Sequence, residues 1–181
     1  MKTTTILASL ALLFLSSCGG PTESKTEKTS VPLPSGLFSI VKGKALSISE
    51  AKALPPGTDV IIKGKVMGSL HPFVENRASF LIGDPEKITS CEVMGEDDHC
   101  KTPWDTCCES PKDIVKSSLN IQVVDDQGRA LKAGLKGKGG LKELVHVIVK
   151  GKVDANSSPE ATIINAGAIQ VMQMSHQGHT H

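Results

Sequence analysis

Aromatic side chains are scarce in this 181-residue sequence, which has four Phe, one Trp and no Tyr. Proteins that bind single-stranded nucleic acid without sequence preference stack the bases on aromatic rings, so the composition disfavours that class. A charge of one sign is also lacking, because 20 basic residues face 19 acidic ones. A chain without a strong net charge has no general attraction for polyanions, and nucleic acid is not an expected partner.

The motifs of common enzymes are absent as well. The sequence has no Gly-x-Ser-x-Gly, no phosphate-binding loop, no paired-glycine dinucleotide signature and no His-Glu-x-x-His. Asp97-Asp98-His99 offers acid–base groups, but three polar neighbours in a loop are ordinary. We therefore expect no enzymatic activity and no required cofactor.

The N-terminal apolar run is too short to span a bilayer. Residues 6–15 supply ten residues, whereas a transmembrane helix needs about 20. With Lys2 ahead of it, this run is typical of a secretory signal peptide. The next residues, Leu15-Ser16-Ser17-Cys18, resemble the bacterial lipobox, which implies that residues 1–17 are removed and that Cys18 is acylated. The alternative is an ordinary signal peptide with a chance cysteine.

The lipobox resemblance also implies a location. An acylated Cys18 would anchor the mature chain to a membrane of the cell envelope, on the extracytoplasmic, periplasmic side. Gly19 stands where some bacteria place an inner-membrane retention Asp, and this favours the outer membrane. Residues 18–35 are rich in Gly, Pro, Ser, Thr, Lys and Glu, a composition that predicts a flexible tether. Residues 36–172 suit one domain with a single core, and residues 173–181 form a His-rich tail.

Hydrophobic alternation within the domain predicts five strands, at residues 60–66, 78–83, 119–124, 145–153 and 161–172. A short helix is expected before them. Ser47 is a candidate N-cap, Glu50 completes a capping box, and Pro55-Pro56-Gly57 ends the segment.

Two of these strands carry nearly the same heptapeptide, VIIKGKV at residues 60–66 and VIVKGKV at residues 147–153. A mid-strand Gly permits a sharp bend at a barrel corner, and the flanking lysines are expected to face water. This pattern resembles the OB-fold, and over residues 47–171 the small periplasmic bacterial OB-fold proteins. The resemblance implies a mainly β fold, a small five-stranded OB-fold-like barrel with one or two short helices. A Cys-rich insert, about residues 84–117, is expected between strands 2 and 3.

Four cysteines fall within 18 residues of the insert: Cys91, Cys100, Cys107 and Cys108. Outside the cytoplasm an even number of thiols favours disulfides. Because a bond between adjacent cysteines needs a strained small ring, the first two are expected to pair separately with the last two, in an order the sequence does not give. Four thiolates, or three with His99, also suit Zn or Cu(I), although the gaps of eight, six and zero residues differ from usual zinc spacings. A redox-active pair is a third alternative, without a Cys-x-x-Cys motif.

The insert also resembles Cys-x-Thr-Pro-Trp-Asp-x-Cys-Cys stretches in bacterial lipoproteins that have no assigned function. Its Trp104 is expected to form the small core of the loop, with a ligand platform as the alternative. Residues 84–113 carry nine acidic residues, and residues 129–152 carry seven basic ones. Opposite charges suggest an insert folded against the barrel. The alternative is two separately solvated charged faces, because surface ion pairs contribute little each. A docked insert would cover part of the face with which OB-folds bind ligands.

Met and His gather at the C-terminus, where they are ligands suited to Cu or Zn. Periplasmic OB-fold copper chaperones use Met-x-Met, His and Trp, to which Met172, Met174, His176 and Trp104 are superficially similar. The alternative is that Met172 caps the core and the histidines are solvated. His146 is expected on the outer face of its strand. The candidate metal ligands of the tail are Met172, Met174, His176, His179 and His181.

These observations favour a lipid-anchored binding or assembly module without catalytic activity. Its contact surface would be the disulfide-stapled insert around Trp104, and its partners the membrane, through Cys18, and another envelope protein. The alternative is a metal-binding (Cu or Zn) lipoprotein that uses the cysteines or the Met/His tail. Oligosaccharide or nucleic-acid binding in an OB groove is a weaker alternative, because the aromatic residues are few.

Overall fold

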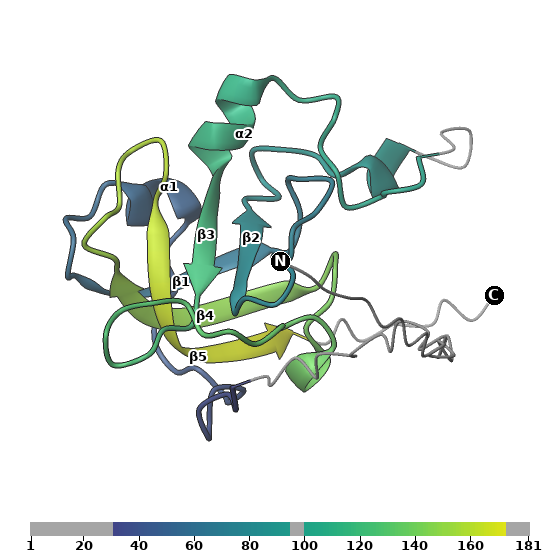
Figure 1. Cartoon of the computed structure of the whole chain (residues 1–181). Coiled ribbons are helices and arrows are strands. Elements are labelled where there is room, and N and C mark those ends of the chain that lie inside the picture. The colour runs from purple at the N-terminus through teal and green to yellow at the C-terminus, as the bar shows by residue number, and fades with distance from the viewer. Residues whose placement is uncertain (1–30, 95–99, 173–181) are drawn as a thin grey trace, which may run out of the picture.

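A computed structural model describes residues 31–94 and 100–172 of the chain. The expected signal peptide, lipidated Cys18, most of the tether, His99 and the tail beyond Met172 lie outside this range. The elements are α1 (Ile48–Lys52), β1 (Asp59–Lys65), β2 (Ser79–Gly83), the 3-10 helix η1 (Cys91–Met94), α2 (Pro111–Ser117), β3 (Ser118–Gln122), the 3-10 helix η2 (Lys138–Gly140), β4 (His146–Val153) and β5 (Ile163–Met172) (Figure 1). No helix in the described range is long and apolar enough to cross a membrane.

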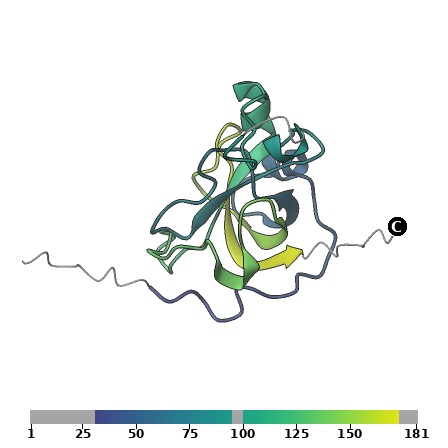
Figure 2. The same cartoon turned by 90° about the vertical axis from the view of Figure 1, so that its right-hand side faces the viewer.

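The five strands form a closed barrel in the order β1-β2-β3-β5-β4 (Figures 1 and 2). The β3–β5 pair is parallel and the other pairs are antiparallel. The β1–β2 pairing is the shortest in the barrel, because Lys65 and Gly83 are its only partners in register. The expectation of a mainly β, five-stranded barrel with two short helices is confirmed.

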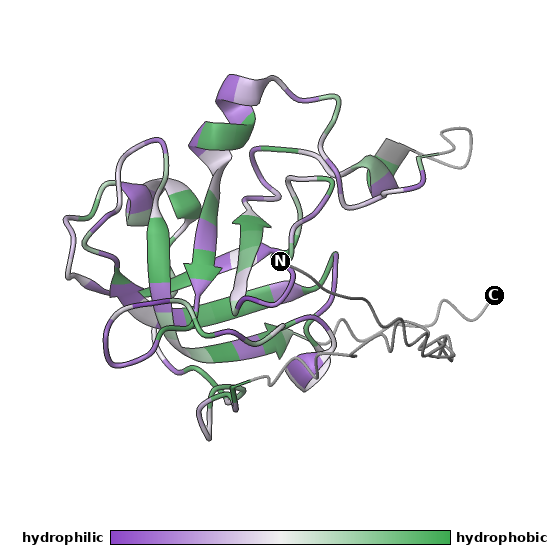
Figure 3. Cartoon of the chain, viewed as in Figure 1, coloured by the Kyte–Doolittle hydropathy of each residue, from purple (hydrophilic) through white to green (hydrophobic). Residues whose placement is uncertain are grey.

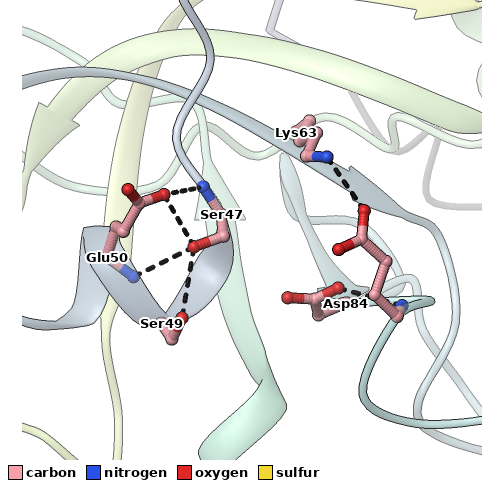
Figure 4. Close-up of polar contacts among 6 residues, drawn as sticks. Ser47, Ser49, Glu50, Lys63 and Asp84 are labelled. Atoms are coloured by element: carbon pink, nitrogen blue, oxygen red, sulfur yellow. Dashed lines mark hydrogen bonds and ion pairs between the residues drawn. The ribbon is translucent and has the colours of Figure 1, made fainter.

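Helix α1 begins as its sequence predicts. The Ser47 hydroxyl accepts a hydrogen bond from Glu50 N at 3.3 Å, and Ser47 N donates to the Glu50 carboxylate at 2.7 Å (Figure 4). This capping box satisfies two backbone donors at the start of the helix. The buried side chains of Ile48 and Ala51 then face the barrel.

The twin heptapeptides are antiparallel partners of each other. Gly64 pairs with Val147, and Gly151 pairs with Val60, so each glycine lies opposite the first valine of the other copy. A Cβ on Gly151 would lie 2.3 Å from the Asn165 carbonyl oxygen, at a bulge in the β4–β5 pair. Both strands thus need a residue without a side chain where the barrel bends.

One expectation for these strands is wrong. Lys63, Lys150 and Lys152 are exposed, but Lys65 is only 6% exposed because residues of the Cys-rich insert cover it. The outward side of a strand faces water only where no other segment lies on it.

The core fills the barrel with aliphatic side chains and one Phe, and Figure 3 shows the hydrophobic residues concentrated on the strands. Leu33 also packs against this core, and Val31 N donates to the Lys132 carbonyl at 3.3 Å. These two contacts lie in residues 31–35, the part of the expected tether that the structure describes, where Leu33 is half-buried and the other residues are exposed. The largest fully buried side chains of the barrel core include Leu37, Ile48, Ile62, Phe80, Ile82, Leu119, Ile121, Leu135, Leu141 and Ile164.

The insert replaces a tight turn between β2 and β3. Gly83 and Ser118 are register partners, and Asp84 N donates to the Ser117 carbonyl at 2.8 Å, so both ends of the insert meet. The insert ends in α2, which has Ser110 as N-cap and Pro at its first position, a strong sequence signal for a helix start. Figures 1 and 2 show α2 standing at the end of the β2–β3 pair.

Candidate functional site

The Cys-rich insert forms a short two-segment ribbon that lies against the chain after β1. Cys91 N donates to the Asp105 carbonyl at 2.8 Å, and Glu92 N donates to the Pro103 carbonyl at 2.9 Å. The ribbon is joined to the barrel because Gly68 N donates to the Trp104 carbonyl at 3.1 Å. The insert is therefore docked on the barrel and is not a separate lobe.

Lys65 is the charged anchor of this docking. Its Nζ donates to the Ser90 hydroxyl at 3.2 Å and forms an ion pair with the Glu92 carboxylate. Burial lowers the pKa of Lys65, whereas the adjacent carboxylate favours the charged ammonium. We expect Lys65 to stay charged, because the Glu92 carboxylate lies beside its ammonium group. Sequence reasoning missed this pair, and nothing in the pattern distinguishes Lys65 from Lys152.

The opposite charges of the insert and the basic segment do not meet as expected. The described ion pairs of the insert run from Glu86 and Glu92 to β1, at Lys63 and Lys65. Figure 4 shows the ion pair of Lys63. Among the described residues, no ion pair joins the acidic insert to residues 129–152. The insert docks as its charge suggested, but against a different strand.

Trp104 connects three parts of the site. Its Nε1 donates to the Leu70 carbonyl at 3.0 Å, its ring is half-buried, and the Lys136 Nζ lies 5.9 Å from the ring centroid. An ammonium at this distance is attracted to an indole face. Trp104 therefore joins the insert to the segment after β1 and to the connection before β4, and part of its ring remains accessible.

A cleft with a volume of about 850 Å³ runs between the insert and the Gly-rich connection before β4. Its insert side is formed by Glu92, Pro103 and Trp104, and its barrel side includes Leu144, Val171 and Met172. Gly139 of the Gly-rich connection lies directly against the Phe38 side chain, since a Cβ on Gly139 would lie 2.2 Å from Phe38 Cγ. Leu144 has a φ of 67°, a conformation that L-residues seldom adopt.

A second hollow, of about 480 Å³, shares Met172 with the cleft. Lys63, Asp84, Glu86 and His146 also line it. His146 is half-buried, as the cross-strand partner of both Lys65 and Met172. Burial, together with the charge of Lys65, lowers the pKa of His146. The outer face expected for His146 is therefore partly covered.

The four cysteines of the insert occupy different environments. Cys91 is buried, Cys100 is half-buried, and Cys107 and Cys108 are exposed. The Sγ atoms of Cys91 and Cys107 lie 3.4 Å apart, longer than the 2.05 Å of a disulfide bond. Burial, and hydrogen bonds that include one with Cys107, raise the pKa of Cys91 to about 11. Cys100 Sγ lies 3.5 Å from the Thr102 carbonyl and also interacts with Cys91.

The candidate metal ligands are only partly described. Met172 is 41% exposed at the end of β5, while His99, Met174, His176, His179 and His181 lie outside the described residues. Within residues 31–94 and 100–172, no group of three or more His, Cys, Asp or Glu is placed to hold a metal ion. The structure brings Met172 and Trp104 to the same cleft, a proximity that the sequence did not predict.

Comparison with known proteins finds two solved structures with a distant similarity to this barrel. No protein-family model and no curated sequence matches the chain. The hypothetical protein YgiW from E. coli has a similar structure at 13% identity, over 72% of this chain and 91% of that chain, with a TM-score of 0.36. Schizosaccharomyces pombe Pot1pC, solved bound to ssDNA, is 11% identical over 75% of this chain and 91% of that chain, with a TM-score of 0.37. The chain is a closed five-stranded barrel by its own strand order, and its similarity to these two structures is distant.

Proposed function

We propose that this protein is a lipid-anchored binding or assembly module of the cell envelope, without catalytic activity. Its contact surface is the docked insert together with the cleft beside Trp104. The observation that carries the proposal is this cleft, which joins a half-buried indole to apolar side chains of β5 and the Gly-rich connection. Half-exposed aromatic anchors beside apolar pockets are typical of protein-binding hot spots.

Exposed apolar side chains extend the same surface. Val93 in η1 is 67% exposed, and Leu70, whose carbonyl holds the Trp104 ring, is 50% exposed. Both residues flank contacts of the insert with the barrel. Together with Trp104, they give a partner protein an apolar centre, and Glu92, Lys142 and Glu143 give it a charged rim, the usual arrangement of an interface.

The location follows from Cys18 and the segment after it. An acyl chain on Cys18 would hold the domain at a membrane, with the residues before Val31 as a spacer. Those residues, fully extended, would reach on the order of 40 Å. The proposed partner is therefore another protein of the same membrane or one that approaches it from the periplasm.

Crosslinking and co-purification test this function. The change Val93→Asp places a charge on the surface without touching the core, and we expect it to abolish capture of the partner, as Trp104→Ala would. The matched control is Ile40→Asp, because Ile40 is 77% exposed and does not line the cleft. Equal capture by the native chain and both insert variants would overturn the proposal.

A metal-handling function is the second candidate. It is favoured by the contact of Cys91 Sγ with Cys107 Sγ, and by the interaction of Cys91 with Cys100, because soft metals bind clustered thiolates. Metal analysis of protein purified without an added His tag tests it. Copper or zinc bound in stoichiometric amount, with thiols released by a chelator, would support this function. Metal-free protein would contradict it.

A further inference from the structure

Two thiols from separate segments of the insert lie next to each other. Cys91 begins η1, Cys107 follows the Trp104 loop, and their Sγ atoms are 3.4 Å apart although the residues are 16 positions apart. A disulfide has a bond length of about 2.05 Å, so the two sulfurs need to approach by about 1.4 Å. Side-chain rotation and a small backbone adjustment can supply such an approach.

Backbone hydrogen bonds connect the two segments that carry these cysteines. Cys91 N donates to the Asp105 carbonyl, and Glu92 N donates to the Pro103 carbonyl. Thr106, next to Cys107, is fully buried. The packing of the insert thus brings Cys91 and Cys107 close together, and the rotation of their side chains sets the distance between the two sulfurs.

Cys100 is the main competitor for pairing with Cys91. Its Sγ lies near both the carbonyl and the hydroxyl of Thr102, at 3.5 and 3.7 Å, and it also interacts with Cys91. Cys108 is exposed next to Cys107. The 3.4 Å contact between Cys91 Sγ and Cys107 Sγ favours Cys107.

We propose that Cys91 and Cys107 form a disulfide latch that joins two segments of the insert and holds the cleft in its binding shape. The pairing stands on the geometry of the insert alone. Its effect on partner binding rests on the proposed function of the contact surface.

The latch closes by thiol–disulfide exchange with an external disulfide. The exposed Cys107 thiolate attacks one sulfur of that disulfide, forms a mixed disulfide and releases one thiol. The Cys91 thiol then loses its proton and attacks Cys107 Sγ, which releases the second thiol. Two protein thiols are oxidised to one disulfide, and the external disulfide is reduced to two thiols. Because Cys107 is exposed and Cys91 is buried, Cys107 is the first to react.

Closing the latch acts on the cleft through η1. Cys91 is next to Glu92, which pairs with Lys65 and lines the cleft, and Cys107 is in the same loop as Pro103 and Trp104. A covalent bond between Cys91 and Cys107 would connect the segment of Glu92 to the segment of Pro103 and Trp104, the two parts of the insert that line the cleft. The residues that line the cleft then lose less conformational entropy when a partner binds.

Double variants of the full chain, each with Cys18→Ser, test the pairing. One variant keeps Cys91 and Cys107 (Cys100→Ser, Cys108→Ser), one keeps Cys91 and Cys108, and one keeps Cys91 and Cys100. Each is equilibrated with oxidised and reduced glutathione, and the remaining thiols are counted by alkylation and mass spectrometry. We expect the equilibrium constant for disulfide formation to be at least tenfold larger for Cys91 with Cys107. A larger constant for either other pair overturns the proposed pairing.

Disulfide mapping of the chain with all four insert cysteines avoids dependence on the folding of those variants. Cleavage after glutamate and after lysine places Cys91, Cys100 and the adjacent Cys107 and Cys108 on three separate peptides. A second map, of a Cys108→Ser variant, removes the ambiguity of the adjacent pair. A peptide with Cys91 linked to Cys107 supports the latch, and one with Cys91 linked to Cys100 contradicts it.

Partner capture by the oxidised and reduced chain tests the role of the latch. We expect capture to fall at least fivefold on reduction, and in the Cys91→Ser variant under oxidising conditions. Equal capture in both states would overturn the role of the latch but leave the proposed function intact. Failure to capture any partner would contradict the proposed function and the role of the latch together, while the mapping would still decide the pairing.

Discussion

Lys65 of β1 and Glu92 of η1 form the ion pair that joins the barrel to its insert, and the Lys65 side chain is almost completely buried. The pair lies at the narrow β1–β2 contact, where Lys65 and Gly83 are the only partners in register. The insert thus adds side-chain contacts to the part of the barrel that has the fewest backbone hydrogen bonds between strands.

Removal of the Glu92 carboxylate should destabilise the fold. We expect Glu92→Gln to lower the free energy of unfolding by about 1–2 kcal/mol, because a buried ammonium loses its charged partner while Glu92 itself is partly exposed. Adding Lys65→Met to this variant should recover part of the loss. The control is Glu86→Gln, since the Lys63–Glu86 pair is exposed on both sides and should change stability by less than about 0.5 kcal/mol. Similar losses in urea unfolding for both Glu variants would contradict the buried anchor.

Gly151 should tolerate no side chain. In Gly151→Ala the new Cβ would meet the Asn165 carbonyl oxygen at 2.3 Å, and we expect a loss of about 2–3 kcal/mol from this overpacking. Gly134→Ala is the matched control, since a Cβ there has no heavy atom within 4 Å. It should be neutral or stabilising by up to about 1 kcal/mol. Chemical denaturation measures both, and a neutral Gly151→Ala would exclude the close approach at the bulge.

The capping box of α1 should be worth a measurable part of the stability. Ser47→Ala removes the hydroxyl that accepts from Glu50 N, and we expect a loss of about 1 kcal/mol. Ser47→Asp should retain most of the stability, because Asp is also a good N-cap. Ser49 is exposed and two residues after Ser47, and Ser49→Ala should change the free energy of unfolding by less than about 0.5 kcal/mol. Thermal unfolding of the three variants gives the comparison, and equal shifts for Ser47→Ala and Ser49→Ala would refute it.

His146 should make the fold less stable as the pH falls below neutrality. Burial and the nearby Lys65 lower its pKa from 6.5, so the unfolded chain takes up a proton near pH 6.5 before the folded chain does. Stability contributed by neutral His146 is complete above pH 6.5 and declines as the pH falls from there to the folded pKa.

The variant His146→Gln should show a smaller loss of stability between pH 7.5 and pH 5 than the native chain. His71→Gln serves as the control, because His71 is exposed. Urea unfolding at both pH values measures the difference. If His146→Gln leaves the pH dependence of stability unchanged and His71→Gln alters it, the titrating residue is His71 and the prediction is wrong.

Much of the barrel could be predicted from the sequence, because its determinants are local. Alternating apolar residues predicted all five strands to within a few residues at each end, and Ser47 with Glu50 predicted the start of α1. The helix α2 was expected without a position, although Ser110-Pro111 marks its first turn.

The site could be predicted only in part. The insert, its place between β2 and β3 and the importance of Trp104 as a packed residue follow from composition and spacing. The burial of Lys65 does not, because Ser90 and Glu92 cover it from 25 and 27 positions away. The proximity of Trp104 to Met172 likewise depends on where the insert docks, which is a tertiary property that no local pattern records.

The two heptapeptides of β1 and β4 carry a consequence for association between chains. Because β1 pairs in antiparallel fashion with a near copy of itself, the β1 strand of a second molecule presents the same side chains as β4, apart from Ile62 in place of Val149. During refolding at high concentration, this second chain competes with the native partner for the same strand edge, as in domain swapping. Barrel closure within one chain must therefore be faster than encounter between chains, and dilution should favour the monomer.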